Sequence, residues 1–195
     1  MRRLSFCVLV FGLAATIHGC ASPRTIFYTL DSSAKAAATG ADYSIVVGPV
    51  SVPAEVDRPQ FVVRLAPNRV DIDEFHRWAS PLQDAIAGVV AENLSAILGT
   101  PQVTTSSRPM PAGTRYRILV DVARFESEPG VAAVLDVVWT VRGAQDGATR
   151  AGRTTVTETV PDREYSTLAA AHSRALLRLS GDIAEAVRAL ERNQP

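Results

Sequence analysis

Residues 80–99, SPLQDAIAGVVAENLSAILG, decide the fold, because they predict one long helix that separates two groups of strands. Ser80 is expected to be the N-cap, Pro81 the first helical residue and Gln83 the second member of a capping box. Apolar residues then recur at the spacing of an amphipathic helix. Gly99 is expected to end the helix, since glycine commonly follows the last helical turn.

Four short strands are predicted before this helix. Ile26–Leu30 and Tyr43–Val52 are rich in β-branched and aromatic residues, and Phe61–Leu65 and Asn68–Ile72 are expected to form a hairpin. The pair Gly48-Pro49 inside the second strand implies an edge position or a bulge, because proline cannot donate to the ladder of a central strand.

The residues after the helix predict three more strands and a second long helix. Apolar residues alternate in Tyr116–Val122 and Leu135–Val141, and a threonine-rich run follows at Ala151–Val160. The last helix is expected over Ser166–Glu191, with Gly181 marking either close packing or a slight kink. This order predicts an α+β domain, with a mostly antiparallel sheet and two long helices packed on one face.

The first residues have the pattern of a secretory signal. Arg2 and Arg3 precede the uncharged stretch Leu4–Ile17, which is too short for a transmembrane helix, and Cys20 follows at once. This arrangement resembles a lipobox, so Cys20 is the predicted lipid attachment site and cleavage is expected before it. The alternative is an ordinary secretory signal that is cut near Ala21.

The resulting organisation has three parts. Residues 1–19 are the predicted lipoprotein signal peptide, and residues 20–42 are the lipid anchor, a short strand and a linker. Asp31–Asp42, DSSAKAAATGAD, is small and polar and is expected to be the flexible part of that linker. Residues 43–195 are predicted to be a single periplasmic α+β domain. Loss of two arginines with the signal leaves 18 basic and 20 acidic residues, which argues against nucleic acid as a partner.

Two histidines remain after the signal. His172 falls on the apolar stripe of the last helix and is expected to be a packed core residue. His76 lies in the acidic segment Asp71–His76, which is expected to be mobile, but the spacing matches no metal-ligand signature. A hydrolytic triad that uses either histidine stays open, although no catalytic motif positions one. The sequence therefore favours a protein that is not an enzyme and needs no metal or cofactor.

Polar and aromatic residues around the first helix suggest a contact surface instead. Arg58 and Gln60 precede a strand, and Trp78 precedes the helix. Tryptophan and arginine are enriched at interface hot spots, so these three are candidate partner-binding residues. The alternative is that Trp78 packs as a hydrophobic staple near the helix start and Arg58 pairs with a local carboxylate.

These segments also carry a family resemblance. In their order and spacing they resemble the PqiC family of ABC-type transport auxiliary lipoproteins, over about residues 20–190. The pieces that carry it are Phe27–Leu30 after the cysteine, Val47–Val50, Val52-Pro53, Asp57–Gln60, Trp78–Leu82 and Glu92–Leu94.

The resemblance implies a function that composition alone does not reveal. Members of this family accompany transporters with MCE domains, which move lipids or other hydrophobic molecules between membranes. The implied partners are an MCE-domain protein with its ABC permease and ATPase, the membrane itself, and possible further copies of this chain. The implied place is the periplasmic face of the outer membrane. A structural envelope lipoprotein and a lipid-carrying module with its own pocket are the alternatives.

Overall fold

The computed structural model describes residues 23–192, except residues 38–39, 108–112 and 146. The predicted signal peptide and Cys20 lie outside the described residues. In chain order the elements are β1 (Ile26–Tyr28), β2 (Ile45–Ser51), β3 (Gln60–Ala66), β4 (Arg69–Trp78), α2 (Leu82–Leu98), β5 (Val103–Thr105), β6 (Tyr116–Glu128), β7 (Ala132–Gly143), β8 (Thr149–Thr159) and α3 (Tyr165–Arg192).

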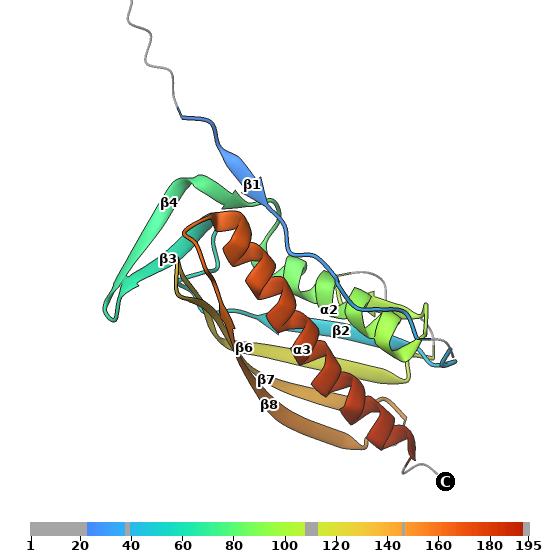
Figure 1. Ribbon diagram of the computed structural model, residues 1–195. Helices are drawn as coiled ribbons and strands as arrows, with labels where there is room; N and C mark the ends of the chain where they lie inside the picture. Colours follow the sequence, from blue (N-terminus) through green and yellow to red (C-terminus); the bar gives the residue numbers. More distant parts are fainter. Residues whose placement is uncertain (1–22, 38–39, 108–112, 146, 193–195) are drawn as a thin grey trace, which may run out of the picture.

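The larger sheet has five strands in the order β5-β2-β6-β7-β8. β2 runs parallel to β5 and β6, while the long pairs β6–β7 and β7–β8 are antiparallel. Helices α2 and α3 both pack on one face of this sheet (Figure 1). The α+β class, with two helices against a mostly antiparallel mixed sheet, is therefore confirmed.

A second, smaller sheet was not predicted as a separate unit. It has three strands in the order β1-β4-β3, and its hairpin β3–β4 projects beyond the body of the molecule (Figure 1). β1 pairs in parallel with the end of β4, which brings residues near the chain start beside the residues that precede α2. We call this unit the small sheet and the five-stranded unit the large sheet.

The core lies between the helices and the large sheet. Alternate residues of β6 and β7 point toward the helices, as strand geometry requires, and the apolar stripe of α3 covers them. Burying one such aliphatic side chain contributes about 1.5–3 kcal/mol. The stripe residues that are fully buried include Leu168, Leu176, Leu179, Ile183 and Val187.

The start of α2 differs from the prediction. Pro81 occupies the N-cap position, no side chain caps the helix, and Ser80 is exposed. The Gln83 side chain donates to Asp57 Oδ2 at 3.1 Å instead of returning to the helix start. The capping box is therefore wrong, while Gly99 ends the helix in a left-handed conformation as expected (φ 69°).

Two glycine expectations have different outcomes. A Cβ at Gly181 would meet no atom within 4 Å, and α3 runs through it, so close packing there is wrong. Gly48 lies in β2, which has neighbours on both sides, so an edge position is also wrong. The register of β2 against β6 shifts between Val47 and Val50, which confirms the bulge.

The predicted flexible linker is held against the helices where the structure describes it. The Asp31 backbone N–H donates to Ser173 Oγ at 3.1 Å, and Asn93 Oδ1 accepts from Ser32 Oγ at 2.8 Å and from the Ala34 N–H at 3.2 Å. The Ala37 N–H donates to the α2 backbone. The small polar residues that suggested flexibility are hydrogen-bonded here. We call residues 30–37 the arm.

Candidate functional site

Arg58 lies in the loop between β2 and β3, on a rigid backbone. The Val56 and Asp57 N–H groups donate to the Pro53 carbonyl, and the Arg58 N–H donates to the Val56 carbonyl at 2.8 Å. Its Nε is buried, yet it has no hydrogen-bond partner among the described residues. The buried Nε costs free energy and is closed to solvent, but the side chain as a whole is partly exposed, so the rest of the guanidinium is what a partner could contact. The local ion pair suggested for Arg58 is not formed in the part of the chain that the structure describes.

Gln60 begins β3 and belongs to a small polar cluster. Its amide Nε2 donates to Glu74 Oε2 at 3.3 Å, and Arg77 Nη2 donates to the same oxygen at 3.1 Å. Gln60 and Arg77 are paired in register, so they lie on one face of the small sheet. The side chains of this cluster are half-exposed, and they already form hydrogen bonds with one another.

Trp78 is a core residue. Only 5% of it is exposed, and its ring stacks on Phe61 with centroids 4.3 Å apart. Phe125 of β6 meets the same ring edge-on at 6.0 Å. The buried position of Trp78 therefore supports the packing alternative over a partner contact. Its side chain does not reach the surface on which Arg58 and Gln60 lie.

Asp73 organises the acidic segment of β4, which is a strand and not a mobile loop. Its Oδ1 accepts from the backbone N–H groups of Phe75 and His76 at 2.8 and 3.0 Å. Its Oδ2 accepts from the Tyr165 hydroxyl at 2.9 Å and lies 3.0 Å from His76 Nδ1. Burial alone would raise the pKa of Asp73, but these hydrogen bonds, with His76 the largest, hold it below its ordinary value.

The partners of Asp73 join the small sheet to α3. The His76 ring stacks on the Tyr165 ring at 4.0 Å, and Tyr165 also contacts Phe61 edge-on at 5.1 Å. Burial and the Asp73 carboxylate raise the pKa of Tyr165 above its ordinary value. No three histidine, cysteine or carboxylate side chains gather as a metal site in the described ranges. This cluster is therefore a structural joint.

His172 lies in the core, and this prediction is confirmed. Its ring is fully buried, its Nε2 lies 2.8 Å from Ser127 Oγ, and it stacks on Phe125 at 3.7 Å. Burial lowers its pKa to about 3, so the ring is neutral at physiological pH. A neutral, enclosed imidazole stabilises packing between α3 and the large sheet.

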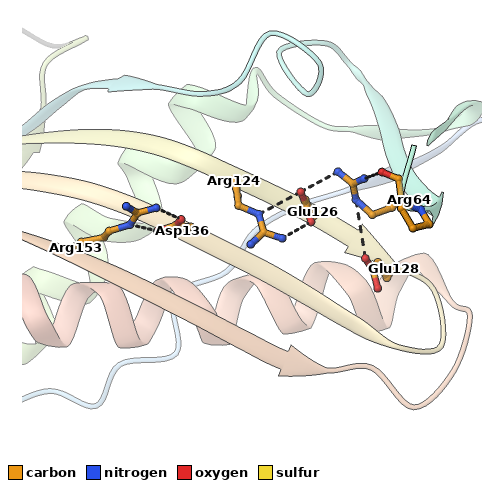
Figure 2. A network of polar contacts seen from close by, with 7 residues as sticks. Arg64, Arg124, Glu126, Glu128, Asp136 and Arg153 are labelled. Atoms are coloured by element: carbon orange, nitrogen blue, oxygen red, sulfur yellow. Dashed lines mark hydrogen bonds and ion pairs between the residues drawn. The ribbon is translucent and has the colours of Figure 1, made fainter. Parts of the chain in front are cut away.

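Charged pairs that the sequence analysis did not find lie on the face of the large sheet away from the helices (Figure 2). Arg153 of β8 binds the Asp136 carboxylate of β7 through Nε at 2.8 Å and Nη2 at 2.5 Å, and Thr155 adds a third hydrogen bond. The Arg153 guanidinium, followed by Thr155, lowers the pKa of Asp136 to about 2 although burial opposes it. Such cross-strand pairs depend on register, which spacing along one strand does not give.

Glu126 continues this network toward the small sheet. It accepts from Arg64 of β3 and from Arg124 of β6, each at 2.8 Å, and Arg64 also lies 3.9 Å from Glu128 (Figure 2). Hydrogen bonding from Arg124 lowers the pKa of Glu126, although burial opposes it. These pairs fix the base of the projecting hairpin to the large sheet.

Open grooves run along the outside of the helices. One, of about 750 Å³, lies between α2, the arm and β5, and another, of about 690 Å³, lies between α3 and β8. The first is lined mainly by small and polar side chains, and the second by arginines and carboxylates together with Trp139. Neither is the deep apolar pocket that an acyl chain prefers. In the part of the chain that the structure describes, no helix is long and apolar enough to cross a membrane.

Comparisons with known proteins agree with this fold. The family model described as ABC-type transport auxiliary lipoprotein component matches residues 28–184. The crystal structure of an uncharacterized protein aligns with a TM-score of 0.69 at 19% identity, over 85% of this chain and 99% of that chain. Protein XCC0632 from Xanthomonas campestris, described with the family model DUF330, aligns with a TM-score of 0.66 at 19% identity, over 82% and 92%. At such identity the two structures show the fold alone. None of the curated proteins matches the chain.

Proposed function

The chain belongs to the family of ABC-type transport auxiliary lipoprotein components, and on that premise we propose that it is the docking component of an MCE-type transport system. The family match spans nearly all the described residues and carries this proposal. The protein is thus an auxiliary lipoprotein of ABC-type transport, held on a membrane by lipid. The resemblance identified from short motifs is confirmed at this level.

The finer assignment concerns the membrane and the cargo. Lipid on Cys20 holds the domain at the periplasmic face of the outer membrane, and the absence of Asp at position 21 supports that membrane by the usual sorting rule. The partners are an MCE-domain protein and its ABC permease and ATPase, and the cargo is a lipid or another hydrophobic molecule. The resemblance of the motifs to PqiC-like lipoproteins supports these assignments.

Binding, and not catalysis, is the chemistry that the described side chains favour. His172 is sealed in the core, and Asp73 and His76 form a joint between β4 and α3. The carboxylates of Glu126 and Asp136 on the large sheet are paired with arginines. What is left for an external partner is surface complementarity, and Arg58 offers a partly exposed side chain that forms no ion pair among the described residues.

Arg58 and Gln60 are therefore the proposed contact residues, with Arg58 the stronger of the two. A guanidinium cannot lose its charge and presents five donors, so a carboxylate or carbonyl on the MCE-domain protein would complete it. Gln60 lies two residues away but already binds Glu74. Trp78 supports this surface from within by fixing the end of β4.

The test is recovery of partners with the lipidated full-length chain from detergent-solubilised envelopes, followed by mass spectrometry of proteins and lipids. We expect an MCE-domain protein and its permease. Arg58→Ala should lower their recovery about tenfold, which corresponds to about 1.4 kcal/mol of binding free energy. Arg142→Ala is the control, because Arg142 is exposed at the other end of the large sheet.

Other results would favour the alternatives. Recovery of lipid without protein partners would favour a lipid-carrying module, and recovery of neither would favour a structural envelope lipoprotein. Equal recovery with both arginine variants would remove Arg58 from the contact set without affecting the docking proposal. Self-association stays a prediction, and cross-linking of the recovered chain would test it.

A further inference from the structure

We propose that the small sheet rests on the phospholipid surface to which the chain is anchored, with Phe27, Val70 and Ile72 entering the headgroup boundary. The inference depends on the family's lipid anchor, with Cys20 as the attachment site, but not on the transport role. It assigns an orientation to the molecule on its membrane.

Exposed apolar side chains are concentrated on the small sheet. Of the eight large hydrophobic residues that are exposed in the described part of the chain, six belong to its three strands, with exposures from 38% to 63%. A buried apolar residue needs no explanation, but a group of exposed ones on one projecting unit indicates a surface that is covered in the cell. The six are Ile26, Phe27, Leu65, Val70, Ile72 and Phe75.

Strand register shows that three of them share one face. Phe27 pairs with Arg77, which pairs with Gln60, while Ile72 pairs with Val62. Paired residues point to the same side, and alternate residues of β3 return to it, so the face continues along the strand. Val70, which is paired with Arg64, completes it, while Val62 on the same side is buried and Arg64 binds Glu126 of β6. Phe61 and its aromatic partners lie on the opposite face, toward the core.

Charges around this face suit phospholipid headgroups. The side chains of Arg24 and Arg69 form no hydrogen bond or ion pair with other described residues, and these arginines lie before β1 and at the hairpin tip. The acidic side chains beside the face are bound by arginines of the small sheet, Glu74 by Arg77, and Glu126 and Glu128 by Arg64. Asp71 pairs with Val63 and so lies on the opposite face. Exposed aromatic and aliphatic groups beside free arginines are typical of surfaces that lie in a membrane interface.

The lipid anchor leaves the small sheet little freedom to face anything else. Ile26 is six positions after Cys20, and a chain of that length spans at most about 20 Å. β1 is therefore held within about 20 Å of the bilayer. β4 and β3 belong to the same sheet and are held near the bilayer too. Gln60, a proposed partner contact, lies at the end of this face away from the hairpin turn. At the hairpin end, over Val70 and Ile72, a protein partner would have to fit into this gap, which favours phospholipid as the occupant there.

An environment-sensitive fluorophore on the surface of the small sheet tests the proposal. Cys20 is acylated and the signal containing Cys7 is removed, so Val70→Cys gives one reactive thiol in the mature lipidated chain. Val138→Cys is the matched control, because Val138 is equally exposed (42% against 43%) but lies on the large sheet. Both labelled chains are reconstituted in vesicles of phosphatidylethanolamine and phosphatidylglycerol that contain no transporter.

We expect the probe at position 70 to shift to the blue and to lose about half or more of its emission when nitroxide-labelled lipid is added, since interfacial groups lie about 5–10 Å deep. The probe at position 138 should change little. No response at position 70, or equal responses at both positions, would overturn the proposal. A response at position 70 that appears only after the transport partner is added to the vesicles would also overturn the proposal. It would assign the face to a protein contact. Ile72→Cys provides a second position if V70C fails to fold.

Partner recovery and membrane contact can fail separately. Arg58 lies in the loop before β3, at the opposite end of that strand from the turn beside Val70, and the vesicles hold no transporter. Loss of partner recovery with intact quenching at position 70 would reject the docking proposal alone, and the reverse pattern would reject the membrane orientation alone.

Discussion

Asp136 and His172 are both buried ionisable residues, but Asp136 is charged and His172 is neutral. Asp136 stays ionised because the Arg153 guanidinium binds it in two places. His172 stays neutral because its ring is fully buried, where it meets the Ser127 hydroxyl and the Phe125 ring and loses contact with water. Their pKa values move to about 2 and about 3, so each contributes to stability in a different pH range.

Asp136→Asn should lower the free energy of unfolding by about 1–3 kcal/mol at neutral pH, because it removes charged hydrogen bonds from a buried site. The folded-state pKa of Asp136 lies below that of the unfolded chain. Its contribution is therefore present above about pH 4 and is lost as the pH falls toward 2. Urea unfolding at several pH values measures this. A difference from wild type that persists undiminished near pH 2 would contradict it.

His172→Gln should remove a pH dependence that the wild-type protein has. The folded-state pKa of this histidine is also lowered, and again the unfolded chain takes up the proton first, here beginning at a higher pH. Wild-type stability should therefore fall by about 1.4 kcal/mol per pH unit as the pH drops from about 6.5 toward 3. The variant, although less stable at pH 7, should lack this slope between pH 6 and 4. Parallel slopes for the two proteins in urea unfolding would refute the assignment.

Single residues were predictable where one element decided their environment. His172 follows from the stripe of its own helix. Trp78 does not, because its neighbours Phe61 and Phe125 come from β3 and β6 and are adjacent only in the folded protein. The lack of a hydrogen-bond partner for Arg58 Nε was also not predictable, because an acceptor could have come from residues that are distant in the sequence.

Among the elements, β7 and β8 accommodate a tryptophan side chain over a glycine at one residue pair. Gly152 lies opposite Trp139, whose indole N–H donates to Thr154 Oγ1 at 3.0 Å. A Cβ at position 152 would overlap the indole ring. The glycine is therefore required by the packing of tryptophan across the two strands.

Gly152→Ala should destabilise the protein by about 1–3 kcal/mol, the usual cost of overpacking. Gly181→Ala in α3 is the matched control, because its Cβ meets no atom within 4 Å. In a helix interior that change should stabilise by about 0.5–1 kcal/mol. Thermal unfolding of both variants measures the opposite signs. A neutral G152A, with unchanged tryptophan fluorescence, would contradict the steric argument.

Element types were more predictable than element ends. Apolar periodicity identified both helices and the long strands, since each element buries one face. The cap failed because Ser80 is exposed and the chain enters α2 through Pro81. β4 was cut short because Asp71 and Asp73 suggested a loop, whereas the Asp73 carboxylate accepts from the backbone of a bulged strand. Strand β5, of three residues, gave no signal long enough to recognise.

At the scale of the whole molecule, the arm connects the small sheet with the groove side of α2. Asn93, fully buried in the middle of α2, holds it through one side-chain oxygen. Lys35 lies in this arm and is the only lysine of the chain. A protease that cuts after lysine therefore reports on this segment alone.

Asn93→Ala should release the arm and increase the rate of cleavage at Lys35 by about fivefold or more, since two hydrogen bonds of about 1 kcal/mol each are lost. Asn68→Ala is the control, because Asn68 is exposed in the β3–β4 turn. Mass spectrometry of the fragments over time measures the rate. Equal cleavage rates in the two variants would show that Asn93 does not restrain the arm.

The overall architecture was predictable in class but not in its division into two sheets. The order of strands and helices is local information, and it led to the correct α+β class. The pairing of β1 with β4 joins residues about fifty positions apart, and the sequence carries no marker of that register. The arm was mistaken for a free linker for the same reason, since its hydrogen-bond acceptors lie on distant helices.

The parallel pairing of β1 with β4 also determines how the molecule carries mechanical load. A pull on the lipid end, directed along β1, stretches its backbone hydrogen bonds with β4 in shear, so that they resist together. Only after these bonds break would tension pass to the arm and then to α2. Motion of the bilayer relative to a docked partner would therefore be borne first by three residues, Ile26–Tyr28, and the body of the domain would keep its shape while that short strand holds.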